Sequence, residues 1–491
     1  MTARAELGAL EASGLIQIAA LQPELEYLFR HALVQDAAYS SLLKQDRRAL
    51  HRAAAETILA LHPERERELA AVIAMHFEQA GEASRAARYL VIAGDHALER
   101  FATKESVAFF TRAYALADDS EAETRLQAAI GAVKAGWVFN PPREDLDRLE
   151  QSVASSQPAD EELVAEALFW ILFLRRQRGE TPDSSPPLRE ALERAAQVDE
   201  ALKNPRAAAL PKALMGAFSA FTGNLHEGAR EMRDSLDAIE RQGDPLQTAM
   251  ISNFLIFTLA RLGEFAAAEK TLAHAQELAG EGDAIARVDA DIAKSVIDLE
   301  RGDLEAASSG AESCSARAED LGAYACVVAS NMVHGSARLA RDDAPAAKTP
   351  LERGEQLAMV TNMAPMRTLI HGFLGSVWAL LGDLPRGALG WERALADARE
   401  MNDRYGEAQT LWARARTRLR EVPSESSEAL ADLDRAIDLF EAMDARPSLA
   451  RSLHDRAQAL RGLGRADDSV RDENRSNELA RQLGLKDPQF A

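Results

Sequence analysis

The chain has 491 residues, of which 47% are hydrophobic, and this composition supplies a large core and argues against a wholly disordered protein. Its formal net charge of −21 repels phosphate backbones, which argues against nucleic-acid binding over a broad surface. Strong helix formers dominate and aromatic residues make up only 5%, so the composition predicts an all-α protein.

Targeting and disulfide signals are missing from the sequence. There is no apolar run of the roughly 18 residues that a membrane helix needs, and Met1–Leu7 lacks the apolar segment of a signal peptide. The two cysteines, Cys314 and Cys326, do not form the framework of a small secreted domain. We therefore expect a cytoplasmic protein without a membrane span.

The first fifty residues have a pattern of their own. Short periodic runs predict a helix, two strands and a second helix at Glu6–Ser13, Leu15–Ala20, Glu26–Arg30 and His31–Leu43. The turn signal Gln22-Pro23 separates the two strands. This order resembles the second half of a winged-helix domain, so we expect residues 1–50 to be a partial winged-helix remnant.

The segment Tyr27–Tyr39 resembles the junction between the ATPase module and the helical repeats of large bacterial regulators. These are STAND-type ATPases, either cyclase-fused or of the LuxR and maltose-activator kind. Arg48–Glu56 and Ala71–Gly81 are similar to the start of that family's repeat array. The chain has no Gly-rich loop ending in Gly-Lys-Ser/Thr, and it has no cyclase domain. The resemblance implies the sensing arm of such a regulator without its ATPase core: a free-standing relic, one part of a split gene or the product of a mis-called start. A separate ATPase or cyclase is one candidate partner.

His31 lies at the predicted change from strand to helix. In the ATPase switches that this region resembles, a winged-helix histidine senses the bound nucleotide, and His31 is the residue at that junction. A structural or helix-capping histidine is the competing interpretation, because the phosphate-binding loop would have to come from another chain.

A tight turn recurs through the second half of the sequence. Its first residues are Gly223, Gly263, Gly302, Asp342, Gly382 and Gly464, at spacings of 40, 39, 40, 40 and 82, the last being two periods. A Gly just past a helix end permits a left-handed C-cap, and the polar residue that often follows it can cap the next helix. The interval therefore predicts helix hairpins with a period of about 40.

Small residues keep a fixed register with these turns. The residues seven positions before the turn are Gly216, Ile256, Ser295, Gly335, Gly375 and Ala457, and those five positions after it are Gly228, Ala268, Ala307, Ala347, Gly387 and Ser469. Of these residues only Ile256 is large. Small side chains let two antiparallel helices approach closely. The pattern resembles the tetratricopeptide repeat (TPR), with a longer period than the usual 34 or so. It predicts a right-handed TPR-like α-solenoid over residues 51–491.

The first helix of each pair lines the concave groove in TPR arrays, and this gives the candidate site. The interior positions in our register, with an aromatic cluster on an earlier first helix, are Phe169, Trp170, Phe173, Asn253, Phe257, Arg261, Met332, Ser336 and Arg461. Aromatic anchors mixed with Arg and Asn can hold a peptide or a small molecule. Ordinary packing between repeats is the alternative for each of them.

No catalytic or metal-binding constellation is found in the sequence. No histidine pair has zincin spacing, no Cys or His cluster has metal-ligand spacing, and no Gly-x-Ser-x-Gly elbow occurs. We expect no cofactor, no metal and no enzymatic activity. The leading hypothesis is a scaffold that binds a protein or peptide in its concave groove, in a bacterial signalling or transcriptional system. The alternative is an arm that senses a small-molecule inducer, which predicts an enclosed pocket instead of an open groove.

Overall fold

The computed structural model describes residues 3–20, 26–139, 143–155, 161–201, 209–241, 245–280, 283–422 and 426–487. Within these ranges the chain forms 24 α-helices, two short 3-10 helices and one two-stranded sheet. The protein is all-α, as its composition predicts, and its paired helices stack into a TPR-like solenoid.

The N-terminal elements are α1 (Ala3–Ala12), β1 (Ile16–Ala20), β2 (Glu26–Phe29), α2 (Ala32–Ser41) and α3 (Lys44–Leu61). They are followed by η1 (Pro63–Arg65), α4 (Glu66–Ala80), α5 (Ala83–Glu99), α6 (Thr103–Leu116), α7 (Ala122–Gly136), η2 (Trp137–Phe139) and α8 (Arg143–Ala154). The middle helices are α9 (Glu161–Gln177), α10 (Pro186–Ala201), α11 (Ala209–Phe221), α12 (Leu225–Glu240), α13 (Pro245–Leu262), α14 (Phe265–Ala279), α15 (Ala284–Arg301) and α16 (Leu304–Leu321). The last are α17 (Tyr324–Ala340), α18 (Ala344–Val360), α19 (Ala364–Leu380), α20 (Leu384–Glu400), α21 (Arg404–Glu421), α22 (Ser426–Met443), α23 (Arg446–Gly462) and α24 (Ala466–Leu483).

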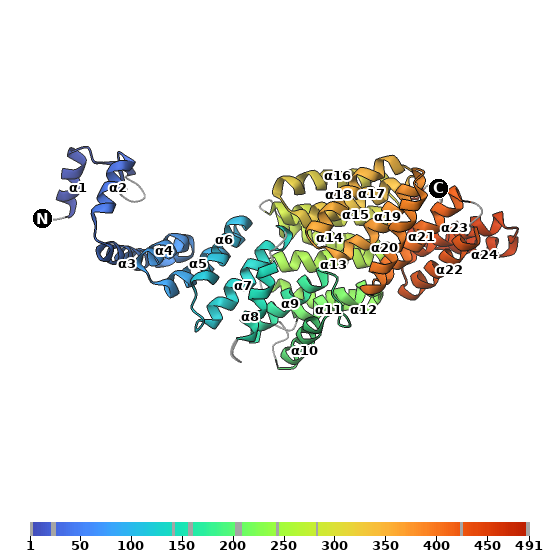
Figure 1. The fold of residues 1–491 in the computed structure, drawn as a ribbon, viewed down its shortest axis with the longest axis horizontal. Helices are drawn as coiled ribbons and strands as arrows, with labels where there is room; N and C mark the ends of the chain where they lie inside the picture. The colour runs from blue at the N-terminus through green and yellow to red at the C-terminus, as the bar shows by residue number, and fades with distance from the viewer. Residues whose placement is uncertain are drawn as a thin grey trace.

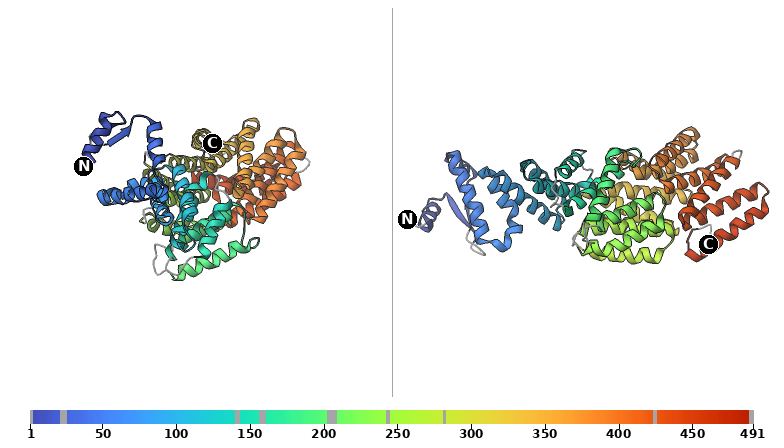
Figure 2. Two further views of the ribbon diagram at one scale, coloured as in Figure 1. Left: turned by 60° about the vertical axis from the view of Figure 1, so that its left-hand side comes forward. Right: turned by 90° about the horizontal axis from the view of Figure 1, so that it is seen from below.

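The molecule is elongated, with an N-terminal arm and a more compact C-terminal body. Helices α1 to α6 extend away from the body, and helices α9 to α24 wind around one another (Figures 1 and 2). In the part of the chain that the structure describes, no helix is long and apolar enough to cross a membrane.

The N-terminal segment has the predicted order of helix, hairpin and helix. Strands β1 and β2 pair antiparallel, with Ile16 opposite Phe29. The predicted turn at Gln22-Pro23 lies outside the described residues. The expected boundary at residue 50 falls inside α3, which continues to Leu61. The identity of this segment as a winged-helix remnant stays a prediction.

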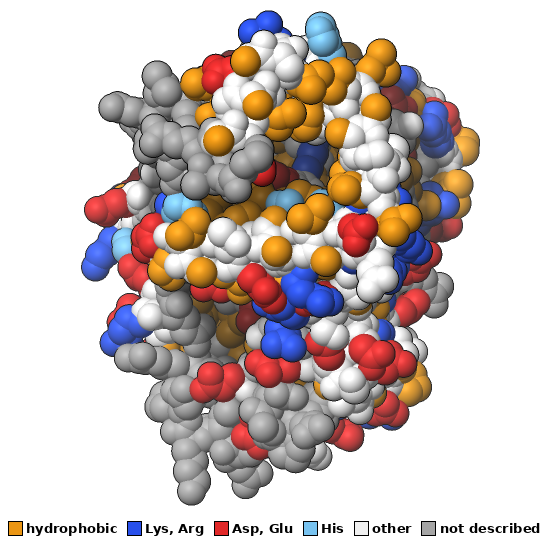
Figure 3. All heavy atoms as spheres, turned by 90° about the vertical axis from the view of Figure 1, so that its left-hand side faces the viewer, with side chains coloured by type: hydrophobic (Ala, Val, Ile, Leu, Met, Phe, Trp, Pro, Cys, Tyr) orange, Lys and Arg blue, Asp and Glu red, His pale blue; other side chains and the backbone are white. Residues whose placement is uncertain are grey.

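This segment buries little of its apolar surface. Ile16 is its one buried hydrophobic residue among the described residues before α3. Seven large hydrophobic side chains from β2 to the end of α3 are exposed: Leu28, Phe29, Leu33, Tyr39, Leu43, Leu50 and Leu61. Figure 3 faces this end of the molecule and shows hydrophobic side chains distributed over it. The segment therefore presents an apolar surface to its surroundings.

The predicted small-residue register is where neighbouring helices meet. The positions seven before and five after each turn are buried in every repeat from Gly216 onward. A Cβ atom on Gly375 would lie 2.9 Å from the backbone oxygen of Gly387, and one on Gly387 would lie 2.8 Å from the oxygen of Gly375. Small residues are needed here because the two backbones nearly touch.

The solenoid completes a superhelical turn and contacts itself. The turn glycines after α9, α11, α13 and α15 lie against residues far along the chain, and each has a positive φ. The pairs are Gly179 with Ala364 and Met401, Gly223 with Arg404 and Met443, Gly263 with Pro447 and Leu483, and Gly302 with Asp487. Helices α9, α13 and α15 consequently contact helices α19 and α23. This closure turns the concave groove of the C-terminal body into a partly enclosed interior.

Candidate ligand-binding cavity

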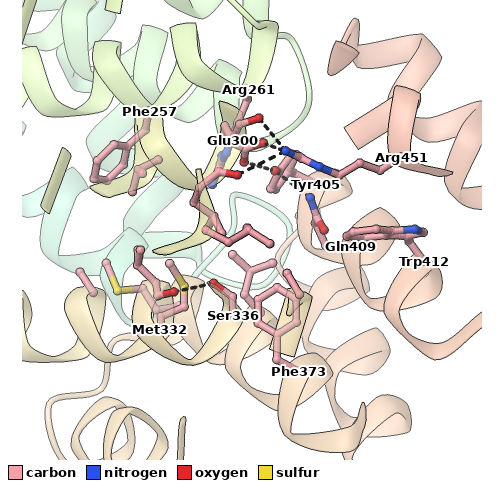
Figure 4. A pocket seen from close by; sticks show the side chains of 18 of the residues that line it. Phe257, Arg261, Glu300, Met332, Ser336, Phe373, Tyr405, Gln409, Trp412 and Arg451 are labelled. Carbon is pink, nitrogen blue, oxygen red and sulfur yellow. Dashed lines mark hydrogen bonds and ion pairs between the residues drawn. The ribbon is translucent and has the colours of Figure 1, made fainter. Parts of the chain in front are cut away.

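The interior of the superhelix contains a cavity of about 1040 Å³, a volume that includes the part open to solvent. Its walls come almost entirely from the first helices of the repeats: α13, α15, α17, α19, α21 and α23. Figure 4 shows side chains from these helices converging on the hollow. The first-helix register of the repeats thus places the cavity on the inner face of the solenoid.

Two smaller cavities adjoin this central one. A cavity of about 680 Å³ extends toward α9 and α11 and shares a wall that consists of Phe257, Arg261, Met332, Met366 and Leu369. We call it the aromatic compartment, because Phe173, Phe218, Phe221, Phe254 and Phe257 line it. The other cavity, of about 490 Å³, lies toward Arg420 and shares Ser336, Phe373 and Trp412 with the centre. The three volumes form a continuous series along the inner helices.

One side of the central cavity carries a polar cluster. The Tyr405 hydroxyl donates to Oε1 of Glu300 at 2.6 Å, and Nε2 of Gln409 donates to the Tyr405 hydroxyl at 2.8 Å and to Oγ of Ser448 at 2.9 Å. Burial raises the pKa of the Tyr405 phenol, and the neighbouring Glu300 carboxylate raises it further. The phenol is therefore a neutral hydrogen-bonding group at physiological pH.

Arg451 fixes the base of this cluster. Its Nε donates to Oδ1 of Asp487 at 2.8 Å, its Nη2 donates to the backbone oxygen of Glu300 at 2.8 Å, and its Nη1 lies 3.6 Å from the Glu300 carboxylate. Burial opposes the charge, but Asp487 and Glu300 outweigh burial, so the pKa of Arg451 is raised. This buried network joins α23, α15 and the C-terminal segment.

The opposite side of the central cavity is apolar. Phe257, Met332 and Phe373 face the hollow from α13, α17 and α19, and Trp412 flanks it from α21 (Figure 4). The indole Nε1 of Trp412 donates to Oδ2 of Asp455 at 2.7 Å, so this ring is held in place. Apolar walls with a few converging polar groups are the usual composition of small-molecule sites.

The structure brings together four of the candidate residues chosen from the sequence. Phe257, Arg261, Met332 and Ser336 all line the central cavity. Phe173 lines the aromatic compartment. The hypothesis that they contact a ligand stays a proposal.

The other candidate residues lie elsewhere. Phe169 and Trp170 are fully buried in the core, where Phe169 stacks on Phe173 with ring centroids 6.4 Å apart. Asn253 is buried between helices and donates to the Asp289 carboxylate. Arg461 is exposed, pairs with Glu473 and lines none of the three cavities. In the structure they make packing or surface contacts, and their assignment to a ligand site stays a prediction.

His31 occupies the N-cap position of α2 and is exposed. Its side chain makes no capping hydrogen bond in this part of the described chain, so the capping interpretation is not what the structure has.

Several cavity residues were not selected from the sequence. Tyr405, Gln409 and Trp412 follow the spacing of one face of α21, so extending the first-helix register to this helix would have selected them. Arg451 and Asp487 carry no comparable sequence signal, because only closure of the superhelix brings them to Glu300.

The described residues contain no group of three His, Cys, Asp or Glu side chains able to hold a metal ion. Cys314 and Cys326 are both buried free thiols, and burial raises the pKa of Cys314 to about 11.

The sequence matches no protein-family model and no curated protein sequence. Solved structures are similar in fold. A Rap protein complexed with Competence and Sporulation Factor aligns with a TM-score of 0.57 at 12% identity, covering 75% of this chain and 99% of that one. The apo quorum sensor NprR from B. thuringiensis aligns at 0.45 and 15% identity, covering 74% and 99%.

A STAND protein with a tetratricopeptide repeat sensor from Pyrococcus horikoshii aligns with a TM-score of 0.45 at 14% identity. The alignment covers 81% of this chain and 59% of that one. At these identities the similarity concerns the fold alone. The alignment with the Rap structure shows that this chain has a TPR-like helical-repeat fold.

Proposed function

We propose that this chain is a non-catalytic sensor scaffold that binds a small molecule or the end of a short peptide inside its superhelix, as the receiving arm of a bacterial regulatory system. The observation that carries the proposal is the central cavity, which combines apolar walls with the Tyr405, Glu300 and Gln409 cluster. An open groove with scattered charges would favour a protein surface instead.

The chemistry of the cavity supports this proposal. In ligand sites a few polar groups typically fix the orientation of a mostly apolar ligand. The central cavity is largely apolar, and Tyr405, Glu300 and Gln409 form a hydrogen-bonded group on one side of it. A similar fold, that of the Rap protein, has been solved in complex with Competence and Sporulation Factor.

The test is native mass spectrometry of protein purified gently from its own host, before and after denaturation. We expect a bound molecule of a few hundred daltons that is released when the protein unfolds. The variant Ser336→Phe places a large ring in the cavity, since Ser336 bonds only to Val333 of its own helix among the described residues. It should abolish the bound mass.

Ser309→Phe is the matched control. Ser309 lies on the outer helix α16, is exposed, and likewise donates to a carbonyl of its own helix, that of Glu305 at 2.9 Å. This variant should keep the bound molecule. Equal loss from both variants, or retention by Ser336→Phe, would remove the cavity as the binding site.

A second proposed function, protein binding, concerns the N-terminal segment. We propose that residues 3–61 bind a separate ATPase module, in agreement with the resemblance of Tyr27–Tyr39 to an ATPase-repeat junction. The supporting observation is the exposure of Leu33 (81%) and Leu43 (72%), which lie in a segment with almost no core of its own.

This second proposal is tested by co-purification with protein identification. Wild-type protein should retain a partner that carries a phosphate-binding loop, and the double variant Leu33→Asp, Leu43→Asp should lose it. Leu463→Asp changes an equally apolar exposed residue at the far end of the solenoid and should not. Loss of the partner in this control as well would contradict a specific N-terminal contact.

A further inference from the structure

We propose that the aromatic compartment is an anion-selective subsite in which Arg176 and Arg261 bind the carboxylate of an aromatic or branched aliphatic ligand. The inference rests on the proposed ligand-binding function and specifies its ligand class. The carboxylate comes either from a small organic acid or from the C-terminus of a short apolar peptide, and the experiment below separates these sources.

Two charged side chains line this compartment among the described residues, and both are cationic: Arg176 and Arg261. None of the described lining residues is a carboxylate. The remaining walls are apolar apart from Gln177 and consist mainly of phenylalanine, methionine and leucine. Two guanidinium groups in so apolar a compartment favour a ligand that brings a negative charge.

Arg176 is the more deeply placed of the two cations. Its residue is 7% exposed, and its Nη2 donates to the backbone oxygen of Met401 at 3.0 Å. The Nη1 atom is buried and has no hydrogen-bond partner among the described residues. An unpartnered donor on a buried cation is costly, because the water it has lost is not replaced.

Arg261 lies at the boundary of the two cavities and belongs to the wall of both. Its guanidinium carbon lies 4.0 Å from the centre of the Tyr405 ring, a cation–π contact. It makes no hydrogen bond to any described residue, so its N–H donors are available to a ligand. Figure 4 shows Arg261 at the edge of the central hollow, close to Tyr405.

The neighbouring carboxylates are engaged with other groups. Asp403 is buried near both arginines, but its Oδ1 caps α21 by accepting the Gly406 backbone N–H at 2.8 Å. Glu300 accepts the Tyr405 hydroxyl, and Asp487 is paired with Arg451. None of the three makes a hydrogen bond to Arg176 or Arg261, so Nη1 of Arg176 and the Arg261 guanidinium still lack an acceptor.

The rest of the compartment fits an apolar ligand body. The Phe254 ring lies 6.2 Å from Phe173 and 6.3 Å from Phe221, measured between ring centroids, so three inner helices contribute neighbouring aromatic rings. Arg is suited to carboxylate recognition because its planar donors match the two carboxylate oxygens. The predicted ligand therefore has one anionic end and one aromatic or branched aliphatic end.

Two matched fluorescent probes test this selectivity on the full chain. The dye 8-anilinonaphthalene-1-sulfonate is anionic, and N-phenyl-1-naphthylamine is the same framework without the sulfonate. We expect Arg261→Met to weaken binding of the anionic dye by about tenfold, the loss expected for a hydrogen bond to a charged group. Binding of the neutral dye should be unchanged.

Control variants separate a binding role from a structural one. Arg353→Met removes a cation that is paired with Glu319 and lines none of the three cavities, and it should leave anionic-dye binding unchanged. Arg261→Lys keeps the charge and should keep the preference for the anion. Arg176→Met also breaks the hydrogen bond to the backbone oxygen of Met401. Its control is Arg446→Met, which breaks a similar hydrogen bond to the backbone oxygen of Leu262.

Displacement experiments identify the source of the carboxylate. We expect 4-phenylbutyrate to displace the anionic dye and 4-phenylbutanamide to fail. A tripeptide of leucine and phenylalanine with a free C-terminus, compared with its amide, tests the peptide source in the same way. Displacement by either free acid but by neither amide supports the proposal.

Two outcomes overturn the inference. Equal binding of the anionic dye to wild type and Arg261→Met shows that this cation does not select the ligand, and equal displacement by acids and amides shows that no anion is recognised. In both cases the neutral dye still reports an apolar ligand site, so the proposed function survives. If neither dye binds the interior of wild-type protein, the proposed function fails as well.

Discussion

Gly302 and Asp487 lie so close together that a Cβ atom on Gly302 would be 2.6 Å from the backbone nitrogen of Asp487. The two residues belong to successive turns of the superhelix. The contact is reinforced by the backbone N–H of Lys486, which donates to the Arg301 carbonyl at 2.8 Å, and by Arg451, which holds the Asp487 carboxylate. Gly302 lies in the tight turn after α15 and permits a left-handed helix end. It is thus also a contact point between two turns of the superhelix.

Gly302→Ala should therefore be more destabilising than the same change at Gly382. Both glycines have positive φ, which costs an alanine about 1–2 kcal/mol, but a Cβ on Gly382 meets nothing within 4 Å. The clash at Gly302 adds about 1–3 kcal/mol. Chemical denaturation of the two variants measures the difference. Equal midpoints would mean that successive turns of the superhelix do not touch at Gly302 in solution.

Gly375→Leu should overpack the contact between α19 and α20. A Cβ atom there would lie 2.6 Å from Cδ1 of Trp391 and 2.9 Å from the Gly387 oxygen, so we expect a loss of about 1–3 kcal/mol or more. Gly462→Leu is the opposite case, because a Cβ atom on Gly462 would meet nothing within 4 Å beyond its own stretch of helix. Leucine is also the better helix former by about 1 kcal/mol. A lowered melting temperature for the first variant and a raised or unchanged one for the second is the expected result.

Removing the Arg451 guanidinium should destabilise the closed superhelix strongly. Arg451→Met leaves the buried carboxylates of Asp487 and Glu300 without their cation, and breaking a buried pair in this way costs about 3–5 kcal/mol. The loss should appear as faster hydrogen exchange in α15, α23 and residues 484–487. Unchanged exchange in all three would show that the network does not hold the turns together.

His371 should make stability depend on pH. It is buried, with Nδ1 3.1 Å from Asp397 and Nε2 3.4 Å from Glu355. Burial lowers the pKa of His371, but the two carboxylates outweigh burial and the net pKa is raised. The folded state therefore prefers the protonated ring. This stabilisation is complete below the unfolded-state pKa of about 6.5 and is lost as pH rises through the raised folded-state pKa.

Accordingly, His371→Gln should lower the melting temperature more at pH 6 than at pH 9. Scanning calorimetry of wild type and variant at both values is the measurement. In the Asp397→Asn background one of the two carboxylates is neutral, so the pH dependence of the histidine effect should diminish. The same melting difference at both pH values would contradict a protonated buried ring.

The position of a candidate residue could be predicted where a local rule applied. Phe257, Arg261, Met332 and Ser336 follow the inner face of first helices, and all four line the central cavity. Arg461 obeys the same rule, but it lies at the end of the last helix pair, where no further repeat encloses it, and it pairs with Glu473 at the surface. Phe169 and Trp170 are fully buried because their helix is packed on several sides.

The sequence by itself determined the helices, their pairing and the register in which they pack. These features depend on helix propensity, turn residues and small side chains that are only a few tens of residues apart. They can therefore be predicted from the sequence of each repeat alone. Only the tertiary structure decided that the solenoid closes on itself and encloses a cavity. Closure places Gly302 on Asp487 and Arg176 on Met401, and it depends on small rotations that accumulate over several repeats. The sequence of a single repeat does not determine this accumulated rotation.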